Sequence, residues 1–558
     1  MRRGNSHPML GGSPAQVCQN TQWPPRGLAP SCRKPATKTP RICCKHGSMN
    51  ARPQVRLFPA PVAQGALVGL LVGLLLALPL LLSLAPRSLM AHDEGYYALQ
   101  GRWILDSGDW LAPRWWSEPL YDRTVGLQWL IAASYRLFGV SGAAAHLPGW
   151  LSALAAATLT RALSRSWLTA GVLVLTPLWL SHAHLAGQDM PLLALELLGI
   201  WGLWSRRPLL AGAWLGPAFL VKGFMALLPA LALLPLLLLE RRALLRQGRF
   251  WAGLILGWLP PLLWLGLSLE HHGLAAVGQL WGKLLWLSRS DTFAPGPFYY
   301  FWNIPANTAP WGLIAPLGWA LLWRRWRRGQ LQRDQLLLWI GYPLLLLLLL
   351  TGFRTKTPYY PLQLTPFIAF AAAQALQWVS HKDGRLGTGL RLPPLLIGGA
   401  LIGIVLIGGL VISAAWIPLP PLGELPLGWL LAAALALGIC WLASAWQPTP
   451  RRRLIAWLLG PYLALVCLLQ GGVFIDHSPA LRQRLAEPAV AALQGQGPVH
   501  FVATGPLNDE AQKELILLAL AAPQLGTLHS SPETVPAGVA VWRHESGSWQ
   551  LQRSPGPP

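Results

Sequence analysis

The sequence predicts an all-α protein that crosses a membrane many times, and its composition and its long apolar runs lead to that prediction. Of the 558 residues, 53% are hydrophobic and only 12% are charged, and the mean hydropathy is +0.40. Repeated apolar runs of roughly 18 to 24 residues have the length that a helix needs to span a bilayer. A water-soluble globular protein is therefore excluded, and about 13 transmembrane helices are expected.

The N-terminal residues 1–56 differ from the rest of the chain. They are rich in Pro, Ser, Arg and Lys and show no apolar periodicity, which predicts a disordered basic tail. Met49 is a candidate for the true start of the protein. The first apolar run, at about residues 65–85, is too long and too rich in Leu for a cleaved signal peptide, so we expect a membrane anchor.

The basic residues predict which side of the membrane each loop occupies. The net charge of +23 does not indicate nucleic-acid binding, because most Arg and Lys form short clusters between apolar runs, as in cytoplasmic loops. Arg52 and Arg56 place the N-terminus in the cytoplasm and the acidic loop 86–141 outside. Within that loop, segment 125–138 is expected to be an amphipathic helix at the membrane interface, because a span there would place every later basic cluster outside.

This register divides the chain into a membrane domain, residues 57–475, and a small α+β domain, residues 476–558, outside the membrane together with the C-terminus. The later domain should hold a strand at 499–502, a helix at 509–522 and a hairpin formed by 539–542 and 549–551. The expected spans after the first lie at residues 143–163, 167–185, 191–204, 209–221, 224–239, 251–269, 299–322, 335–351, 360–379, 393–416, 427–446 and 454–474.

Acidic residues are scarce, and their distribution indicates a catalytic loop. Asp and Glu total 21 against 44 Lys and Arg, yet six acids lie between positions 93 and 122 of the loop 86–141. Asp93 and Glu94 are adjacent and directly follow the first predicted span. A simple connecting loop would have no need of this cluster.

Cations on the predicted outer side point to a phosphate-bearing substrate. Lys222, Arg354 and Lys356 oppose the positive-inside trend, which favours an anionic ligand. A carboxylate can take the proton of an acceptor hydroxyl or amine while cations hold a phosphate leaving group. The candidate residues for this group transfer are Asp93, Glu94, Tyr97, Asp122, Arg123, Asp189, Lys222, Arg354, Lys356, Tyr359 and Tyr360.

Several short motifs, in the same order, resemble those of the GT-C membrane glycosyltransferases. The first-loop signature of that family is similar to segments 92–97, 107–113, 121–123 and 128–130. Its second acidic motif, its Lys-Gly motif and its late Lys-to-Tyr-Pro motif resemble segments 188–191, 221–223 and 356–361. The chain is most similar to the branch that contains the aminoarabinose transferase of lipid A and the dolichyl-phosphate-mannose protein mannosyltransferases.

The resemblance implies a GT-C fold, a polyprenyl-phosphate sugar donor and a lipid or protein acceptor, in the plasma (inner) membrane. No cofactor is required, and a divalent metal is neither demanded nor excluded. We expect inverting transfer with Asp93 as the base. Asp189 and Glu94 would assist it, and the expected substrate contacts are Tyr97, Asp122, Arg123, Lys222, Arg354, Lys356 and Tyr360.

One departure from the family concerns the first loop. The family usually has Lys-Pro-Pro after the first-loop Asp, whereas here Arg123-Thr124-Val125 follows Asp122. A guanidinium keeps the positive charge but replaces a point charge with a planar fork. The geometry toward phosphate or acceptor is therefore expected to differ.

Structural roles compete with these functional ones. Asp93 or Asp189 could cap a helix, Glu94 could favour a helix dipole, and Lys222 could extend toward the membrane interface. His182 and His184, two residues apart on a helix, point in different directions and predict no metal pair.

Other functions are also open. Trp110, Trp115 and Trp116 are the aromatic candidates for stacking on a sugar. A transporter or lipid flippase is the main alternative function, although its inverted repeats and broken helix pairs are not evident. A ligase that joins a lipid-linked glycan to another lipid is a further alternative.

Overall fold

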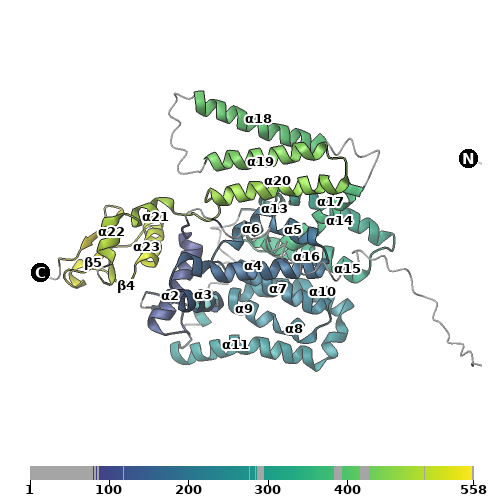
Figure 1. Ribbon diagram of the computed structural model, residues 1–558. Coiled ribbons are helices and arrows are strands. Elements are labelled where there is room, and N and C mark those ends of the chain that lie inside the picture. Colours follow the sequence, from purple (N-terminus) through teal and green to yellow (C-terminus); the bar gives the residue numbers. More distant parts are fainter. Residues whose placement is uncertain are drawn as a thin grey trace, which may run out of the picture. The chain divides into compact units, whose positions relative to one another are not determined.

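The computed structural model is mostly helical (Figure 1). The predicted tail 1–56, with Met49, lies outside the described residues, and so does nearly all of the first predicted span. The structure describes residues 80, 83, 87–116, 118–274, 277–282, 285, 295–381, 392–414, 427–495 and 497–555.

The acidic loop begins with two helical segments that position its carboxylates. η2 (Ala91–Gly95) is one turn of π-helix, and α2 (Tyr96–Ser107) continues it. The predicted amphipathic helix is present as α3 (Gly126–Phe138), whereas its place at the membrane interface remains a prediction. Its last residues, Leu137 and Phe138, expose 75% and 66% of their surface, as expected of a helix end that meets lipid.

The helices after α3 follow the predicted order, with two corrections. α4 (Gly142–Ser164) is continuous, but the predicted span 167–185 is split into α5 (Trp167–Val174) and α6 (Pro177–Ala183). Proline lacks an N–H and disfavours helix at the residue before it, so Pro177 starts a new helix. In the same way the predicted span 299–322 is divided into α13 (Tyr299–Asn307) and α14 (Trp311–Arg327) around Pro310.

Among the described residues, five stretches are both long and apolar enough to cross a membrane: Pro208–Glu240, Gly248–His272, Arg333–Gly352, Leu427–Ala445 and Pro450–Gln470. A multi-pass membrane architecture is therefore supported, whereas the expected number of 13 transmembrane helices remains a prediction.

The remaining helical elements of the membrane domain are α7 (Asp189–Trp204), α8 (Pro208–Ala213), α9 (Leu215–Lys222), η3 (Gly223–Ala226), α10 (Leu227–Glu240), η4 (Arg242–Arg246), α11 (Gly248–His272), α15 (Arg333–Leu336), η5 (Leu337–Gly341), α16 (Tyr342–Gly352), η6 (Tyr360–Leu364), α17 (Thr365–His381), α18 (Leu392–Ala414), α19 (Leu427–Ala445) and α20 (Pro450–Gln470).

Close packing of α11 against α8 and α9 forms one wall of the region described below. A Cβ atom at Gly216 would lie 1.9 Å from the carbonyl oxygen of Gly257. Only glycine permits this approach, which is typical of helix pairs within a membrane. The contact holds the C-terminal half of α11, with Pro261 and Trp264, beside the end of α9.

The C-terminal segment forms the predicted α+β unit. β3 (Val499–Val502), α23 (Asp509–Ala521) and the hairpin β5 (Ala540–Glu545) and β6 (Ser548–Arg553) are confirmed. The prediction missed α21 (Pro479–Leu485), α22 (Pro488–Gln494), η7 (Pro532–Thr534) and β4 (Leu525–His529), a short strand with no apolar alternation. The sheet order is β4-β3-β5-β6, with β3 parallel to both neighbours and β5 antiparallel to β6.

This unit shares a hydrophobic core with the acidic loop. Leu99 and Trp103 of α2 are buried together with Phe501, Leu515 and Trp549 of the C-terminal unit. Burial of such large apolar side chains is the main source of stability at a contact of this kind. The helix that follows Asp93 and Glu94 is therefore held by residues about 400 positions later in the chain.

Candidate active site

The turn η2 separates the two adjacent carboxylates. Its π-helical pattern is seen in the Gly95 N–H, which donates to the Met90 carbonyl at 2.7 Å. Asp93 is exposed and Glu94 is fully buried. Met90 and Gly95 occupy the N-cap positions of η2 and α2, so Asp93 is the N-cap residue of neither segment. A capping role for Asp93 is therefore not supported, and its carboxylate is available to a ligand.

Glu94 is bound on both carboxylate oxygens. One oxygen accepts the Met90 N–H at 2.8 Å. The other lies 2.6 Å from His146 Nε2 on α4 and accepts the Ala186 N–H at 2.8 Å. Burial acts to raise the pKa of Glu94, but His146 and the two backbone donors outweigh it and lower the pKa. Glu94 thereby ties the Asp93 turn to the segment that leads into Asp189.

Arg123 lies beside the Asp93 turn. Its guanidinium is over the rings of Tyr96 and Tyr97, 4.6 and 4.8 Å from their centres, and its Nε is 3.4 Å from Asp122. Burial opposes the charge of Arg123, but Tyr97 and Asp122 more than offset burial and raise its pKa. Within the described part of the chain, Arg123 Nη1 and Asp122 Oδ1 are buried without hydrogen-bond partners. Such atoms are typical of a site that a ligand completes.

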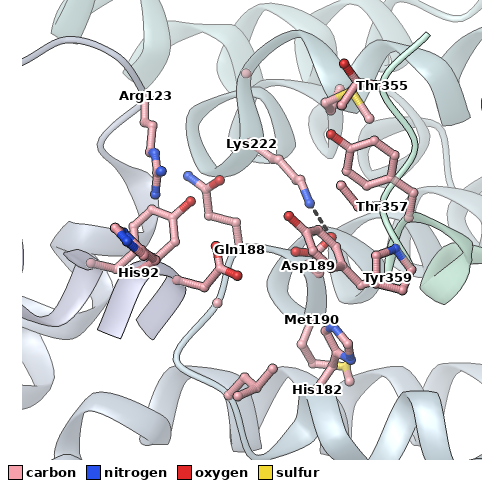
Figure 2. A pocket seen from close by; sticks show the side chains of 18 of the residues that line it. His92, Arg123, His182, Gln188, Asp189, Met190, Lys222, Thr355, Thr357 and Tyr359 are labelled. Carbon is pink, nitrogen blue, oxygen red and sulfur yellow. Dashed lines mark hydrogen bonds and ion pairs between the residues drawn. The ribbon is translucent and has the colours of Figure 1, made fainter. Parts of the chain in front are cut away.

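A second acid and base pair lies at the start of α7 and the end of α9. Asp189 is the first residue of α7, and its carboxylate forms an ion pair with Lys222. The Lys222 ammonium also faces the rings of Tyr359 and Tyr360, 5.4 and 5.5 Å from their centres. Lys222 therefore points into the site and is not simply extended toward the membrane interface. Figure 2 shows this pair between Gln188 and Tyr359.

The segment before η6 brings a further cation. Lys356 is 7% exposed, and its ammonium donates to the Phe353 carbonyl at 2.7 Å. Arg354 is exposed and lies outside the lining of the cavity described next. The structure thus brings Lys356 to the other candidates and leaves Arg354 apart.

These groups line one cavity of about 1510 Å³. All candidate residues for the group transfer except Arg354 contribute to its wall, although they come from four distant parts of the sequence. The wall also contains His92 and Gln188, which lie in the predicted motif segments but were given no role, and His182, which was considered only as a metal ligand. Sequence reasoning missed Thr357, His477, Asp509 and Lys513. Apolar side chains make up much of the remaining wall: Phe219, Phe224, Met225, Trp264, Leu265, Val277, Leu280, Trp281 and Phe353.

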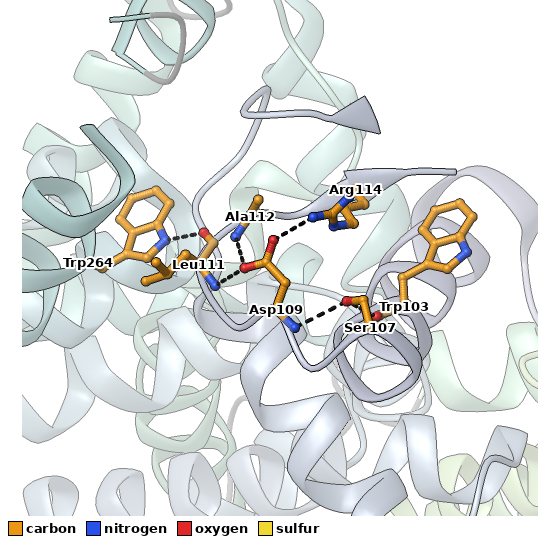
Figure 3. A network of polar contacts seen from close by, with 7 residues as sticks. All are labelled: Trp103, Ser107, Asp109, Leu111, Ala112, Arg114 and Trp264. Carbon is orange, nitrogen blue, oxygen red and sulfur yellow. Dashed lines mark hydrogen bonds and ion pairs between the residues drawn. The ribbon is translucent and has the colours of Figure 1, made fainter. Parts of the chain in front are cut away.

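The motif at 107–113 has a structural role next to this cavity. Asp109 accepts hydrogen bonds from the N–H groups of Leu111 and Ala112 at 2.9 and 3.3 Å, and from Arg114 at 2.8 Å (Figure 3). Trp264 of α11 donates to the Leu111 carbonyl at 2.8 Å. Burial acts to raise the pKa of Asp109, but the bonds from Arg114 and the backbone lower it. The network fixes the shape of the loop and joins it to a membrane helix.

The tryptophans proposed as sugar platforms lie elsewhere. Trp115 stacks on Tyr96 with ring centres 5.4 Å apart. Trp116 contacts both Trp103 and Phe501. Neither they nor Trp110 line the cavity, so the structure assigns Trp115 and Trp116 to the joint with the C-terminal unit. Among the described residues, no group of three His, Cys, Asp or Glu is arranged to hold a metal ion, and metal dependence remains a matter for experiment.

Comparison with known proteins gives an independent view of the chain. No family model matches it. A relative from Pseudomonas fluorescens, named undecaprenyl phosphate-alpha-4-amino-4-deoxy-L-arabinose arabinosyl transferase 2, is 29% identical over 443 residues, which are 73% of this chain and 72% of the relative. A transferase of the same name, without the numeral, from Shewanella sediminis is 26% identical over 383 residues, 62% of this chain and 64% of the relative.

A solved structure decides the fold. The crystal structure of ArnT from Cupriavidus metallidurans bound to undecaprenyl phosphate superposes with a TM-score of 0.62, at 20% identity, and covers 84% of this chain and 86% of that one. The chain has the fold of ArnT. Together, the named relatives and this shared fold confirm the resemblance to GT-C membrane glycosyltransferases and to aminoarabinose transferases that the motifs predicted.

Proposed function

We propose that this protein is an integral membrane glycosyltransferase that moves a sugar from a polyprenyl-phosphate donor to an extracytoplasmic acceptor. One observation carries the proposal: a single cavity joins an exposed carboxylate, Asp93, to the cations Arg123, Lys222 and Lys356 and to an apolar wall. The names of the relatives make undecaprenyl-phosphate aminoarabinose the first donor to test. Whether a pentose or a hexose is transferred is for that test to decide.

The membrane side of the cavity suits the donor. A polyprenyl phosphate carries an anionic group next to a long apolar chain, so its site needs cations beside an apolar surface. Lys222 and Lys356 supply positive charge, while Phe219, Phe224 and Trp281 supply apolar surface. The C. metallidurans ArnT structure holds undecaprenyl phosphate in the same fold, which supports this assignment.

The chemistry is a single displacement. The acceptor hydroxyl or amine forms a bond to the anomeric carbon, the bond from that carbon to the phosphate oxygen breaks, and Asp93 takes the acceptor proton. The electron pair leaves with the polyprenyl phosphate, whose charge is stabilised by Arg123, Lys222 and Lys356. One displacement inverts the anomeric configuration, and a product with retained configuration would contradict this route.

In this scheme Glu94 positions another residue, Asp93, and Asp189 holds the charged group of Lys222. Glu94 has no oxygen free for substrate, because it is bound to Met90, His146 and Ala186. We assign it the positioning of Asp93 relative to Asp189. Asp189 holds the Lys222 ammonium within the cavity, where a phosphate can share it.

The topology that accompanies this function has a cytoplasmic N-terminus, an extracytoplasmic active site and an extracytoplasmic C-terminus. Basic clusters between the helices support it through the positive-inside rule. A transporter or flippase would need a path with two openings. Asp93, the cations and two residues of the C-terminal unit, Asp509 and Lys513, line one cavity, and this arrangement is better suited to chemistry at one face.

The test is a transfer assay with the full-length protein in lipid nanodiscs. Undecaprenyl-phosphate aminoarabinose is supplied with envelope lipids and glycoproteins from cells that lack the gene, and products are identified by mass spectrometry. The proposal expects a sugar-modified product and free undecaprenyl phosphate in equal amounts. Movement of intact donor across the bilayer without cleavage would instead establish the transporter alternative.

A further inference from the structure

The C-terminal unit contacts the catalytic turn itself, through α23. A Cβ atom at Gly95 would lie 2.8 Å from Ile516 Cγ2, so the backbone of η2 rests against α23. Further along α2, the buried Arg102 donates to the carbonyls of Ala519 and Ala522 at 3.1 and 2.7 Å, at the C-terminal end of α23. These contacts fix the direction of α23, and its first residues reach the cavity.

Three polar side chains meet where α23 reaches the cavity. His92 Nε2 lies 2.9 Å from Asp509 Oδ1, and Lys513 Nζ lies 2.7 Å from Asp509 Oδ2. All three line the cavity that also contains Asp93, and His92 directly precedes that residue in the sequence. We call His92, Asp509 and Lys513 the α23 patch.

A fourth polar group borders the same cavity. His477 lies on the segment between α20 and α21, and its backbone N–H donates to the Ser88 carbonyl at 3.4 Å, close in sequence to His92. Its Nε2 atom is buried and has no hydrogen-bond partner among the described residues. A buried imidazole nitrogen of this kind is a group that a ligand can satisfy.

The charges of the α23 patch argue against a phosphate ligand. The Lys513 ammonium is 2.7 Å from Asp509 and also 2.7 Å from Glu510, so its single charge is matched by two carboxylates. Asp93 follows His92 and adds another negative charge. In contrast, Arg123, Lys222 and Lys356, which suit the donor phosphate, all come from the membrane domain.

We propose that the α23 patch is an acceptor subsite that recognises the hydroxyl groups of a carbohydrate. This inference rests on the proposed glycosyltransferase function and adds the class of acceptor. A carboxylate accepts hydrogen bonds, an ammonium donates them, and a histidine does either, which together match the paired donors and acceptors of neighbouring sugar hydroxyls. The exposed fractions of His92, Asp509 and Lys513, 42%, 68% and 36%, leave room for such a ligand.

The experiment measures acceptor and donor separately with the full-length protein in nanodiscs. Undecaprenyl-phosphate aminoarabinose is the donor. The acceptors are vesicles containing lipid A, its deacylated and dephosphorylated glucosamine disaccharide, and a serine peptide without sugar. For Asp509→Asn and Lys513→Gln, we expect the KM or inhibition constant of both carbohydrate acceptors to rise about tenfold, the usual effect of one lost hydrogen bond to a charged group. The donor KM should change less than twofold.

Two further variants separate recognition from folding. Lys513→Arg retains a charged donor, and we expect it to recover most of the acceptor affinity that Lys513→Gln loses. Glu533→Gln alters an exposed residue of the same unit outside the cavity and should behave as wild type.

The outcomes are distinct. Unchanged acceptor constants, or an equal loss of donor and acceptor binding, would overturn the subsite. The subsite would also be overturned if the enzyme used the serine peptide in preference to both carbohydrate acceptors. It would be overturned as well if the wild type cleaved the donor but neither bound nor modified either carbohydrate acceptor. If the wild type neither binds undecaprenyl phosphate nor consumes the donor, the glycosyltransferase function itself fails.

Discussion

The catalytic turn and the loop after α2 contain the same kind of residue in opposite states. In the turn, Asp93 is exposed to the cavity, and nearby Arg123 and Asp122 each have a buried polar atom without a partner among the described residues. In the loop, Asp109 is bound by Arg114 and by two backbone N–H groups. The first arrangement is ready for a ligand, whereas the second is already complete.

This difference teaches how to assign the acids of the first loop. Both sites belong to motifs of the resembled family, so motif membership alone does not separate chemistry from structure. Hydrogen-bond satisfaction separates them, because buried polar groups without partners are costly and persist where function needs them. By the same criterion, Glu94 has a structural role like that of Asp109, whereas its neighbour Asp93 is available to a ligand.

The largest effect in this comparison is expected from Lys222→Met. The change removes the ammonium that faces the departing phosphate and leaves the Asp189 carboxylate without its partner. Loss of one stabilising charge of this kind lowers the rate about a hundredfold or more. Steady-state transfer assays should show the drop in kcat/KM, and Lys222→Arg should recover part of it. Activity of Lys222→Met within a few-fold of wild type would remove Lys222 from the phosphate site.

Glu94→Gln should have the next largest effect, through position. An amide cannot accept the same three hydrogen bonds, so we expect a loss of about 2 to 3 kcal/mol in the free energy of unfolding. Transfer should fall about thirtyfold, with kcat affected more than the donor KM. Chemical denaturation measures the free energy of unfolding, and steady-state transfer assays on the same preparation measure kcat and the donor KM. A normal kcat in a destabilised protein would show that Glu94 supports the fold alone.

A smaller effect is expected from Arg123→Lys, which restores the residue usual in the family. The ammonium keeps the charge but cannot stack on both Tyr96 and Tyr97 as the planar guanidinium does. Binding of undecaprenyl phosphate should weaken about tenfold or less. Isothermal titration calorimetry in detergent measures the affinity for undecaprenyl phosphate. The matched control is Arg553→Lys, which lies outside the cavity. Tighter binding by the variant would contradict the proposed stacking.

The smallest effect on transfer is expected from Asp109→Asn. Its lowered pKa means that its stabilising contribution is fully present above the unfolded-state pKa of about 4 and is lost as the pH falls from there through the lower pKa of the folded state. At neutral pH the change should cost about 1 to 2 kcal/mol of stability, while transfer stays within a few-fold. Thermal unfolding measured from pH 7 downward should show the full difference between variant and wild type at pH 7, and this difference should shrink progressively once the pH falls below about 4.

Much of this arrangement could be predicted from the sequence. Apolar run lengths indicated the helices, including α3, whose place at the membrane interface remains a prediction from the placement of charges. Motif order and the scarcity of acids indicated Asp93, Asp189 and Lys222. The breaks at Pro177 and Pro310 were missed because an apolar run continues through them, although proline gives a local signal.

The contacts of individual side chains could not be predicted. Glu94 was placed with Asp93 because the two are adjacent, whereas the turn directs them to different surroundings. Arg354 was grouped with Lys356 because both are cations on the predicted outer side, and only Lys356 reaches the cavity. The approach of Asp509 and Lys513 depends on the shared core of α2 and α23, and one sequence carries no signal for a contact over so long a separation.

The most direct measurement compares Asp93→Asn with Asp109→Asn in the same nanodisc preparation, for both undecaprenyl phosphate binding and sugar transfer. Removing the base should lower transfer by Asp93→Asn about a thousandfold while binding and thermal stability remain near wild type. Asp109→Asn should show the reverse, with lower stability and transfer within a few-fold. Full transfer by Asp93→Asn at normal abundance and stability would contradict its assignment as the base.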